Sequence, residues 1–148
     1  MEEKVHIIPF INDQECPLLT YIQVGVKTVE GRKYSKKYQS IRPNDVVVLR
    51  VRRWGDLPVR VTYVHRYRTL EEFLEKETIH RTVPCVKTMD EALRIYNVFT
   101  DPAEREELRK QYGYGMVAFG IEPLPPDDAK YLKKYLKYKR KYKRAVKN

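Results

Sequence analysis

Cysteine is scarce in this sequence, because the 148 residues include only Cys16 and Cys85. Such low usage is typical of a reducing compartment, so we expect both thiols to be free and partly buried and the protein to be cytoplasmic. Long apolar runs are missing as well, since no stretch approaches the roughly 20 apolar residues of a membrane span. The polar residues Met1 to Lys4 do not resemble a signal peptide. The sequence therefore predicts a protein without a membrane partner.

Patterns that bind metals or phosphates are also missing. The six glycines form no loop of the type that cradles a nucleotide phosphate, which argues against nucleotide hydrolysis. Neither His6 nor His80 has a cysteine or a carboxylate at metal-ligand spacing. His65 falls on an apolar strand face, where a histidine is more often a core or pocket-lining residue than a ligand. We therefore expect no metal and no cofactor.

Acidic residues are absent from the C-terminal end of the chain. Residues 129–148 hold ten of the 30 lysines and arginines and no acid, which leaves 20 basic and 20 acidic residues in 1–128. The net charge of +10 is therefore carried by this tail, and ten unopposed positive charges favour a polyanionic partner. The tail cations expected to contact nucleic acid are Lys130, Lys133, Lys134, Lys137, Lys139, Arg140, Lys141, Lys143 and Arg144.

A proline-rich segment, 123–126, separates the tail from the body. We predict a domain over residues 1–124 and a helical tail over residues 125–148, in a chain expected to be monomeric. The tail tyrosines are spaced four, three and four and fall on one helical stripe: Tyr131, Tyr135, Tyr138 and Tyr142. Two interpretations of this stripe stay open. It stacks on bases while the lysines follow the nucleic-acid backbone, or it docks on the body.

The body alternates strand-like and helix-like patterns. Strand patterns cover residues 5–11, 46–53, 58–67 and 115–122, with a hairpin connection at 54–57. Capping residues at Thr69 and Thr88 and the pair Asp101-Pro102 mark helix starts, and a short helix is expected over 16–24. Residues 32–40 are expected to form a polar, basic loop. Four or five strands with short interleaved helices predict a small α+β barrel.

The segment Gly25-Val-Lys27-Thr28-Val-Glu30-Gly31-Arg32 carries the strongest functional signal. It crowds a cation, a hydroxyl, a carboxylate and a guanidinium into a helix-to-strand junction, where polar side chains are suited to line a cleft. If the segment is extended, Thr28, Glu30 and Arg32 share one face, and Lys27 points to the other face unless the chain bends there. A plainer interpretation is a surface ion pair between Glu30 and Arg32, which contributes little stability.

The spacing of Gly25, Lys27, Glu30 and Arg32 resembles the G-x-K-x-x-E-x-R signature of the ASCH domain, a PUA-like family. Further similarities within residues 14–124 are the turn at 41–45, the Thr-Leu-Glu-Glu-Phe-Leu helix at 69–74, Pro84 before a helix and the Tyr114-Gly115 pair before the last strand. The resemblance is strongest to the small stand-alone archaeal and bacterial forms. It implies a small PUA-like β-barrel with interleaved short helices. It also implies RNA binding, although the family contains a few enzymes.

The RNA-binding interpretation assigns ligand binding to five residues of this segment and its continuation: Lys27, Glu30, Arg32, Lys33 and Tyr34. Arg32 and the neighbouring lysines would hold phosphate. Glu30 would accept a hydrogen bond from an exocyclic amine, as glutamate does from cytosine N4. The expected partner is RNA or another single-stranded nucleic acid, with a modified nucleoside as a candidate ligand.

A hydrolase acting on RNA or a nucleoside is the alternative. Some bacterial ASCH-like proteins are amidohydrolases of N4-acetylcytidine with a Lys-Thr-x-Thr motif, in which lysine is the base and the second threonine is the nucleophile. Lys27 and Thr28 match, but Glu30 replaces the nucleophile, and a neighbouring carboxylate raises a lysine pKa, which is the wrong direction for a general base. Catalysis would then depend on Lys27 and Glu30, with Thr28 and Glu77 as weaker candidates. A protein adaptor whose tail binds acidic surfaces is a third class.

Overall fold

The computed structural model describes residues 4–12, 16–52, 55–130 and 132. Its regular elements follow one another along the chain as β1 (Val5–Phe10), α1 (Leu18–Gln23), β2 (Val29–Lys33), α2 (Lys36–Gln39), β3 (Val46–Val51), β4 (Gly55–Tyr67), α3 (Leu70–Glu77), α4 (Ile79–Thr82), α5 (Met89–Phe99), α6 (Pro102–Tyr112) and β5 (Met116–Pro123). Residues 126–130 and 132 are helical as well. None of the helices described combines the length and the apolar composition needed to cross a bilayer.

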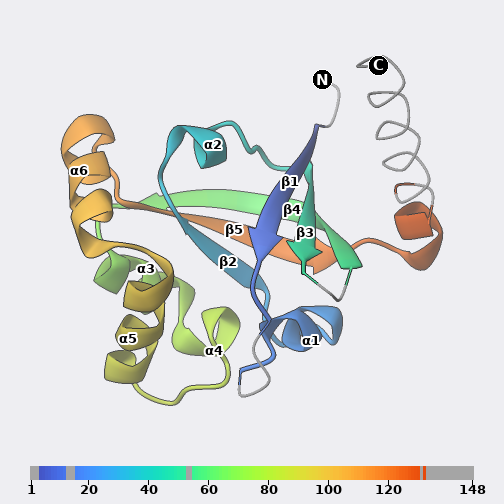
Figure 1. Cartoon of the computed structure of the whole chain (residues 1–148), viewed down its shortest axis with the longest axis horizontal. Helices are drawn as coiled ribbons and strands as arrows, with labels where there is room; N and C mark the ends of the chain where they lie inside the picture. Colours follow the sequence, from blue (N-terminus) through green and yellow to red (C-terminus); the bar gives the residue numbers. More distant parts are fainter. Residues whose placement is uncertain (1–3, 13–15, 53–54, 131, 133–148) are drawn as a thin grey trace.

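The strands of the described chain form one five-stranded sheet in the order β1-β3-β4-β5-β2. β1 runs parallel to β3, and the other neighbouring pairs are antiparallel. The sheet curls into a half-barrel, with short helices around it (Figure 1). Its two outermost strands are joined by a hydrogen bond of 2.9 Å, which Arg32 Nη2 on β2 donates to the carbonyl oxygen of Pro9 on β1. The predicted α+β, PUA-like barrel is therefore confirmed.

Local capping explains where three helices begin. Thr69, Thr88 and Asp101 precede α3, α5 and α6, and each side chain accepts a hydrogen bond from a backbone N–H of the first turn. Pro102 occupies the first turn of α6, where a missing N–H leaves no helical hydrogen bond unmade. Gly113 ends this helix with φ +90°, a left-handed conformation suited to glycine. These predicted boundaries are confirmed.

Two one-turn helices differ from the prediction. The sequence predicts a loop over 32–40, but Lys36–Gln39 form α2. α4 follows α3 after a single residue, Thr78, whose φ of 72° turns the chain between the two helices. A helix of one turn contains too few residues to show an apolar periodicity, so its sequence pattern does not differ from that of a loop.

The inner face of the curled sheet carries much of the apolar core. Ile8, Leu49, Val59 and Phe119 come from different strands, share this face through the strand register and are almost fully buried. The outer face is covered at the β5–β2 end by α3. There the Phe73 ring lies so close to Gly31 that a Cβ at this position would overlap it. A glycine on β2 therefore allows α3 to approach the sheet closely.

A second, smaller apolar cluster lies on the outer face of β3. Its members are Val46, Val48, Leu124 and Leu132, with Ala129 packed against them. Leu132 is 8% exposed, whereas the neighbouring Lys130 is exposed. The first turns after the proline-rich segment therefore pack on the body. The tail tyrosines, the tail cations from Lys133 onward and Trp54 of the predicted hairpin connection lie outside the described residues.

Cys16 and Cys85 form a disulfide, with their Cα atoms 5.5 Å apart. The prediction of two free thiols is therefore wrong. A low cysteine count is a general indication of a reducing compartment, but it does not show whether the fold brings two particular cysteines together. Here Cys16 lies just before α1 and Cys85 follows α4, so the bond joins segments that are 69 residues apart in the chain.

Candidate functional site

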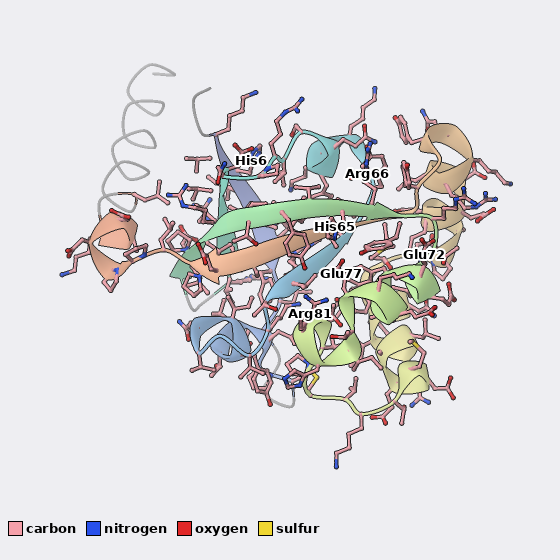
Figure 2. The ribbon with its side chains drawn as sticks, turned by 180° about the vertical axis from the view of Figure 1, so that it is seen from behind. His6, His65, Arg66, Glu72, Glu77 and Arg81 are labelled. Atoms are coloured by element: carbon pink, nitrogen blue, oxygen red, sulfur yellow. A yellow bond between two sulfur atoms is a disulfide. The ribbon has the colours of Figure 1, made fainter. Side chains whose placement is uncertain are left out.

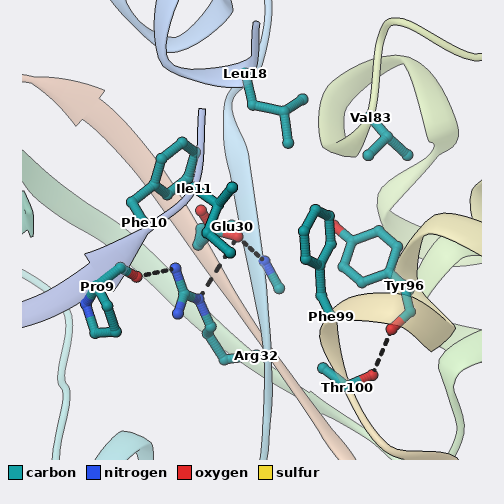
Figure 3. Close-up of a pocket in the computed structure, with 11 residues that line it drawn as sticks. Pro9, Phe10, Ile11, Leu18, Glu30, Arg32, Val83, Tyr96, Phe99 and Thr100 are labelled. Carbon is teal, nitrogen blue, oxygen red and sulfur yellow. Dashed lines mark hydrogen bonds and ion pairs between the residues drawn. The ribbon is translucent and has the colours of Figure 1, made fainter. Parts of the chain in front are cut away.

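A pocket of about 250 Å³, called the seam pocket below, opens where β1 and β2 approach each other. Its walls come from the end of β1, from α1, from β2 and from the C-terminal end of α5 (Figure 3). Most of the lining is apolar and is supplied by Phe10, Ile11, Leu18, Val83 and Phe99. Two charged side chains, Glu30 and Arg32, interrupt this lining. The structure therefore brings these two residues of the signature segment to one cavity.

Glu30 is held so that one of its two carboxylate oxygens has no partner. Oε1 accepts a hydrogen bond of 3.1 Å from the backbone N–H of Gly31 and lies 3.8 Å from Arg32 Nε. Oε2 is buried and has no hydrogen-bond partner within the described part of the chain. A buried carboxylate oxygen without a donor is unfavourable, and a bound ligand is one source of the missing donor.

Arg32 reaches across the pocket from β2 to β1. Nη2 donates to the carbonyl oxygen of Pro9, and Nη1 donates to the Tyr38 hydroxyl at 3.2 Å. The guanidinium carbon also lies 5.6 Å from the centroid of the Tyr38 ring, which is a cation–π distance. The side chain is only 18% exposed, so these contacts fix its position. With Glu30 as acceptor and Arg32 as donor, the pocket offers both a hydrogen-bond acceptor and a hydrogen-bond donor to one edge of a ligand.

Lys27 lies behind Glu30 and is closed off from solvent. It is 1% exposed, and Nζ donates to the carbonyl oxygens of Val29 at 2.5 Å and Thr82 at 2.6 Å, 4.0 Å from Glu30 Oε1. Burial lowers the pKa of Lys27, Glu30 opposes this by raising it, and Arg32 lowers it further. The expectation that Glu30 leaves this pKa raised is therefore wrong, because removal of the ammonium group from water outweighs the ion pair.

Most residues that line the pocket were not identified from the sequence pattern, and three of them bear directly on its chemistry. Tyr96 on α5 is 4% exposed, and burial together with the Glu30 charge raises the pKa of its hydroxyl, which therefore stays protonated. Phe99 at the end of α5 and Ile11 after β1 are 48% and 66% exposed at the same pocket. Large apolar side chains exposed beside a cavity are typical of binding sites. The sequence offered only their apolar character, since their exposure depends on the fold.

Two predicted ligand residues, Lys33 and Tyr34, lie away from the seam pocket. Lys33 forms an exposed ion pair with Glu104 on α6. The Tyr34 ring packs edge to face against Tyr112 and Tyr114, with centroids 6.1 and 5.8 Å apart. Successive residues of a strand point to opposite faces of the sheet, so Lys33 lies on the face opposite to that of Arg32, which lines the pocket.

The two weaker catalytic candidates, Thr28 and Glu77, do not line the seam pocket either. The backbone N–H of Thr28 donates to the carbonyl oxygen of Arg81 at 3.1 Å. Glu77 lies at the end of α3 and is 2% exposed. It accepts hydrogen bonds from three side chains of β4: Tyr63, His65 and Tyr67. Within the ranges that the structure describes, no three histidine, cysteine or acidic residues are grouped so as to hold a metal ion.

Comparison with known protein families shows which family this chain belongs to. A model of the ASCH domain matches residues 15–143. The chain belongs to the ASCH domain family. The resemblance carried by the segment from Gly25 to Arg32 is therefore confirmed, and the seam pocket is a cavity of an ASCH domain.

Two solved structures from Pyrococcus are similar to this ASCH domain over most of their length. The crystal structure of hypothetical protein PH0355 is 31% identical, with a TM-score of 0.66, and the match covers 82% of this chain and 99% of that one. The solution NMR structure of protein PF0455 from Pyrococcus furiosus is 32% identical, with a TM-score of 0.62, and covers 81% and 97%. No curated protein matches the sequence.

Proposed function

We propose that this ASCH domain binds RNA and takes one amine-bearing base, from an ordinary or a modified nucleoside, into the seam pocket. The ASCH family is generally linked to RNA binding. One observation carries the proposal: Glu30 Oε2 is buried and has no donor among the described residues. The exocyclic amine of a base supplies such a donor, and glutamate accepts this type of bond from cytosine N4.

The size and the lining of the pocket favour a single base over a longer stretch of chain. A volume of about 250 Å³ lies just below the roughly 300–1,000 Å³ of pockets for drug-sized ligands. Phe10 and Phe99 both line the pocket and are suited to pack against the faces of a planar ligand, and Glu30 and Arg32 are available to its edge. Cytosine carries an amine and a carbonyl oxygen, which match the carboxylate and the guanidinium respectively.

The basic tail supplies the sequence-independent part of the affinity in this proposal. Residues 129–148 contain ten cations and no acid, so they attract phosphate groups without reading the base. Contacts to phosphate position a nucleic acid, whereas contacts to base edges select it. We therefore assign affinity mainly to the tail and selection mainly to Glu30.

The hydrolase alternative has less support from the site. Burial lowers the pKa of Lys27, which is the direction a general base requires. Its Nζ, however, donates to two backbone carbonyl oxygens, and the residue is not part of the pocket lining. Glu77, the second carboxylate considered, belongs to another cluster. A general base must reach the proton that it removes, so we retain binding as the proposed function.

Calorimetric titration with cytidine and uridine tests the proposal, because uridine has a carbonyl oxygen in place of the amine at position 4. We expect cytidine to bind more tightly by about fivefold to 150-fold, the equivalent of roughly 1–3 kcal/mol for one good base contact. Glu30→Gln keeps the shape and removes the charge, so the preference should fall by about fivefold. Glu104→Gln removes an exposed carboxylate elsewhere and serves as the matched control.

Equal affinity of the wild-type protein for the two nucleosides would contradict the proposal, as would a preference that survives Glu30→Gln unchanged. Incubation with N4-acetylcytidine separates binding from catalysis. Release of cytidine, abolished by Lys27→Ala or Glu30→Gln, would favour the hydrolase. Unchanged ligand together with Glu30-dependent binding supports a binding domain.

A further inference from the structure

Opposite the seam pocket, the other face of the sheet carries a cluster of polar aromatic residues. Ala118 on β5 pairs with His65 on β4 and with Gly31 on β2, and residues paired across strands share a face. Glu30, one residue before Gly31, therefore faces the opposite side. The cluster around His65 is thus separate from the seam pocket, and the inference that follows rests on the proposed binding of RNA but not on a ligand in that pocket.

A buried carboxylate, Glu77, organises this cluster. It accepts hydrogen bonds from the hydroxyl groups of Tyr63 and Tyr67 and from His65 Nδ1, the last at 3.0 Å. Burial alone would raise the pKa of Glu77, but these donors outweigh it and lower the pKa, so the group stays anionic at neutral pH. An ionised carboxylate only accepts hydrogen bonds, so His65 Nδ1 is the donor to Glu77, and this bond fixes the ring orientation.

Two of these donors form a rigid ring pair at the surface, called the aromatic platform below. It consists of His65 and Tyr63, whose ring centroids are 4.3 Å apart with an interplanar angle of 36°. The His65 side chain is 54% exposed, although its partner Glu77 is only 3% exposed. The Tyr63 ring packs over Gly120, where any Cβ would overlap it. Both rings are therefore ordered before binding, which reduces the entropy that a ligand contact loses.

A cation borders the aromatic platform. Arg81 on α4 has a side chain that is 43% exposed, and its Nη2 lies 4.0 Å from Glu77 Oε1. Its Nε donates to the backbone carbonyl oxygen of Glu77 at 2.8 Å, which holds the stem of the guanidinium in place. Figure 2 shows His65 on β4 with Glu77 and Arg81 next to it on the adjoining helices. Exposed guanidinium N–H groups in such a position are suited to a phosphate.

We propose that the aromatic platform is a second contact for single-stranded RNA, in which one base stacks on His65 and Tyr63 and Arg81 binds the adjoining phosphate. Single-stranded RNA is recognised by stacking of unpaired bases on histidine and tyrosine rings and by arginine contacts to the backbone. A role limited to anchoring α3 on β4 accounts for Tyr67, which is buried. This anchoring role does not explain why the exposed imidazole of His65 is stacked on the ring of Tyr63.

The test uses full-length protein carrying Glu30→Gln, so that base selection in the seam pocket does not enter the result. Its affinity for a fluorescein-labelled short oligouridylate is measured by anisotropy at a salt concentration that suppresses tail binding. We expect His65→Ala to weaken binding by at least about fivefold, since base stacking contributes roughly 1–3 kcal/mol per base. His65→Phe retains a ring and should restore most of the affinity. His80→Ala, an exposed histidine on α4, is the matched control.

Three results would overturn the inference. The first is the same affinity for His65→Ala and His80→Ala. The second is a loss with His65→Phe as large as with His65→Ala, because the imidazole would then act through its nitrogens instead of its ring surface. The third is equal binding of duplex RNA with the same dependence on His65. Thermal unfolding of each variant excludes loss of the fold as the cause, which matters here because His65→Ala also removes one of the donors to Glu77.

Discussion

Reduction of the Cys16–Cys85 disulfide is expected to destabilise this ASCH domain by about 4 kcal/mol. The bond links residues separated by 69 positions. In the chain-entropy model, a cross-link of this span removes unfolded-state entropy equivalent to about 4 kcal/mol at 25 °C. Domains of this size unfold with a free energy of about 5–15 kcal/mol, so the effect is a large fraction of the total. The corresponding fall in melting temperature is about 10 °C.

The disulfide also fastens two walls of the seam pocket. Cys16 is two residues before Leu18, and Cys85 is two residues after Val83, and both apolar residues line the pocket. Reduction frees these walls to move apart, so the binding of a nucleoside should weaken along with the stability. Binding of RNA through the tail should not change, because the tail cations do not depend on the pocket geometry.

Thermal unfolding followed by circular dichroism, with and without dithiothreitol, measures the effect on stability. A double variant, Cys16→Ser with Cys85→Ser, should melt at the temperature of the reduced wild-type protein and should not respond to the reductant. The reasoning is refuted if the oxidised and reduced wild-type proteins melt together. It is also refuted if two thiols are titrated in protein that has been denatured without reduction.

Three further predictions follow from single features of the fold. Gly31→Ala places a methyl group against the Phe73 ring and should lower the free energy of unfolding by about 1–3 kcal/mol in a urea titration. For the binding of single-stranded RNA, the slope of log affinity against log salt is expected at about −4 to −5 if five to seven phosphates are neutralised. Deletion of 133–148, which leaves Leu132 packed on β3, should bring this slope towards zero. Glu77 has a lowered pKa in the fold, so its stabilising contribution is complete above its unfolded pKa of about 4.5 and is lost as the pH falls through the folded value. Melting temperatures between pH 7 and pH 3 should therefore drop less in Glu77→Gln than in the wild-type protein.

The elements predicted best from the sequence are those that a short segment encodes by itself. Thr69, Thr88 and Asp101 cap helices through their own side chains, and Gly113 supplies the left-handed residue that ends one. Each signal requires only a few neighbouring residues, so no knowledge of the packing is needed. The disulfide is the opposite case, because Cys16 and Cys85 are 69 positions apart in the sequence and only the tertiary fold brings them together.

The behaviour of Lys27 shows why the electrostatics of the site were harder to predict. The sequence places Glu30 three residues away, and this charge does raise the lysine pKa. Burial lowers the pKa and has the larger effect. Nothing in the sequence shows that Nζ will be buried between the carbonyl oxygens of Val29 and Thr82. A charge pattern reveals the partners of an ionisable group, but desolvation depends on the surrounding packing.

The seam pocket and the aromatic platform illustrate how the curl and the pleat of a single sheet divide residues that the sequence groups together. Arg32 and Lys33 are adjacent, yet the pleat sends one to the seam and the other to α6. The curl has the opposite effect, because it brings Pro9 of the first strand to Arg32 of the last strand in the sheet order. The bond between them closes the edge of the half-barrel with the same guanidinium that stands beside Glu30. Arg32 therefore both closes the fold at this edge and contributes one of the two charges in the cavity, the other being Glu30. A short motif in the sequence singles out Arg32, whereas the apolar walls around it come from segments far apart in the chain and could not be predicted.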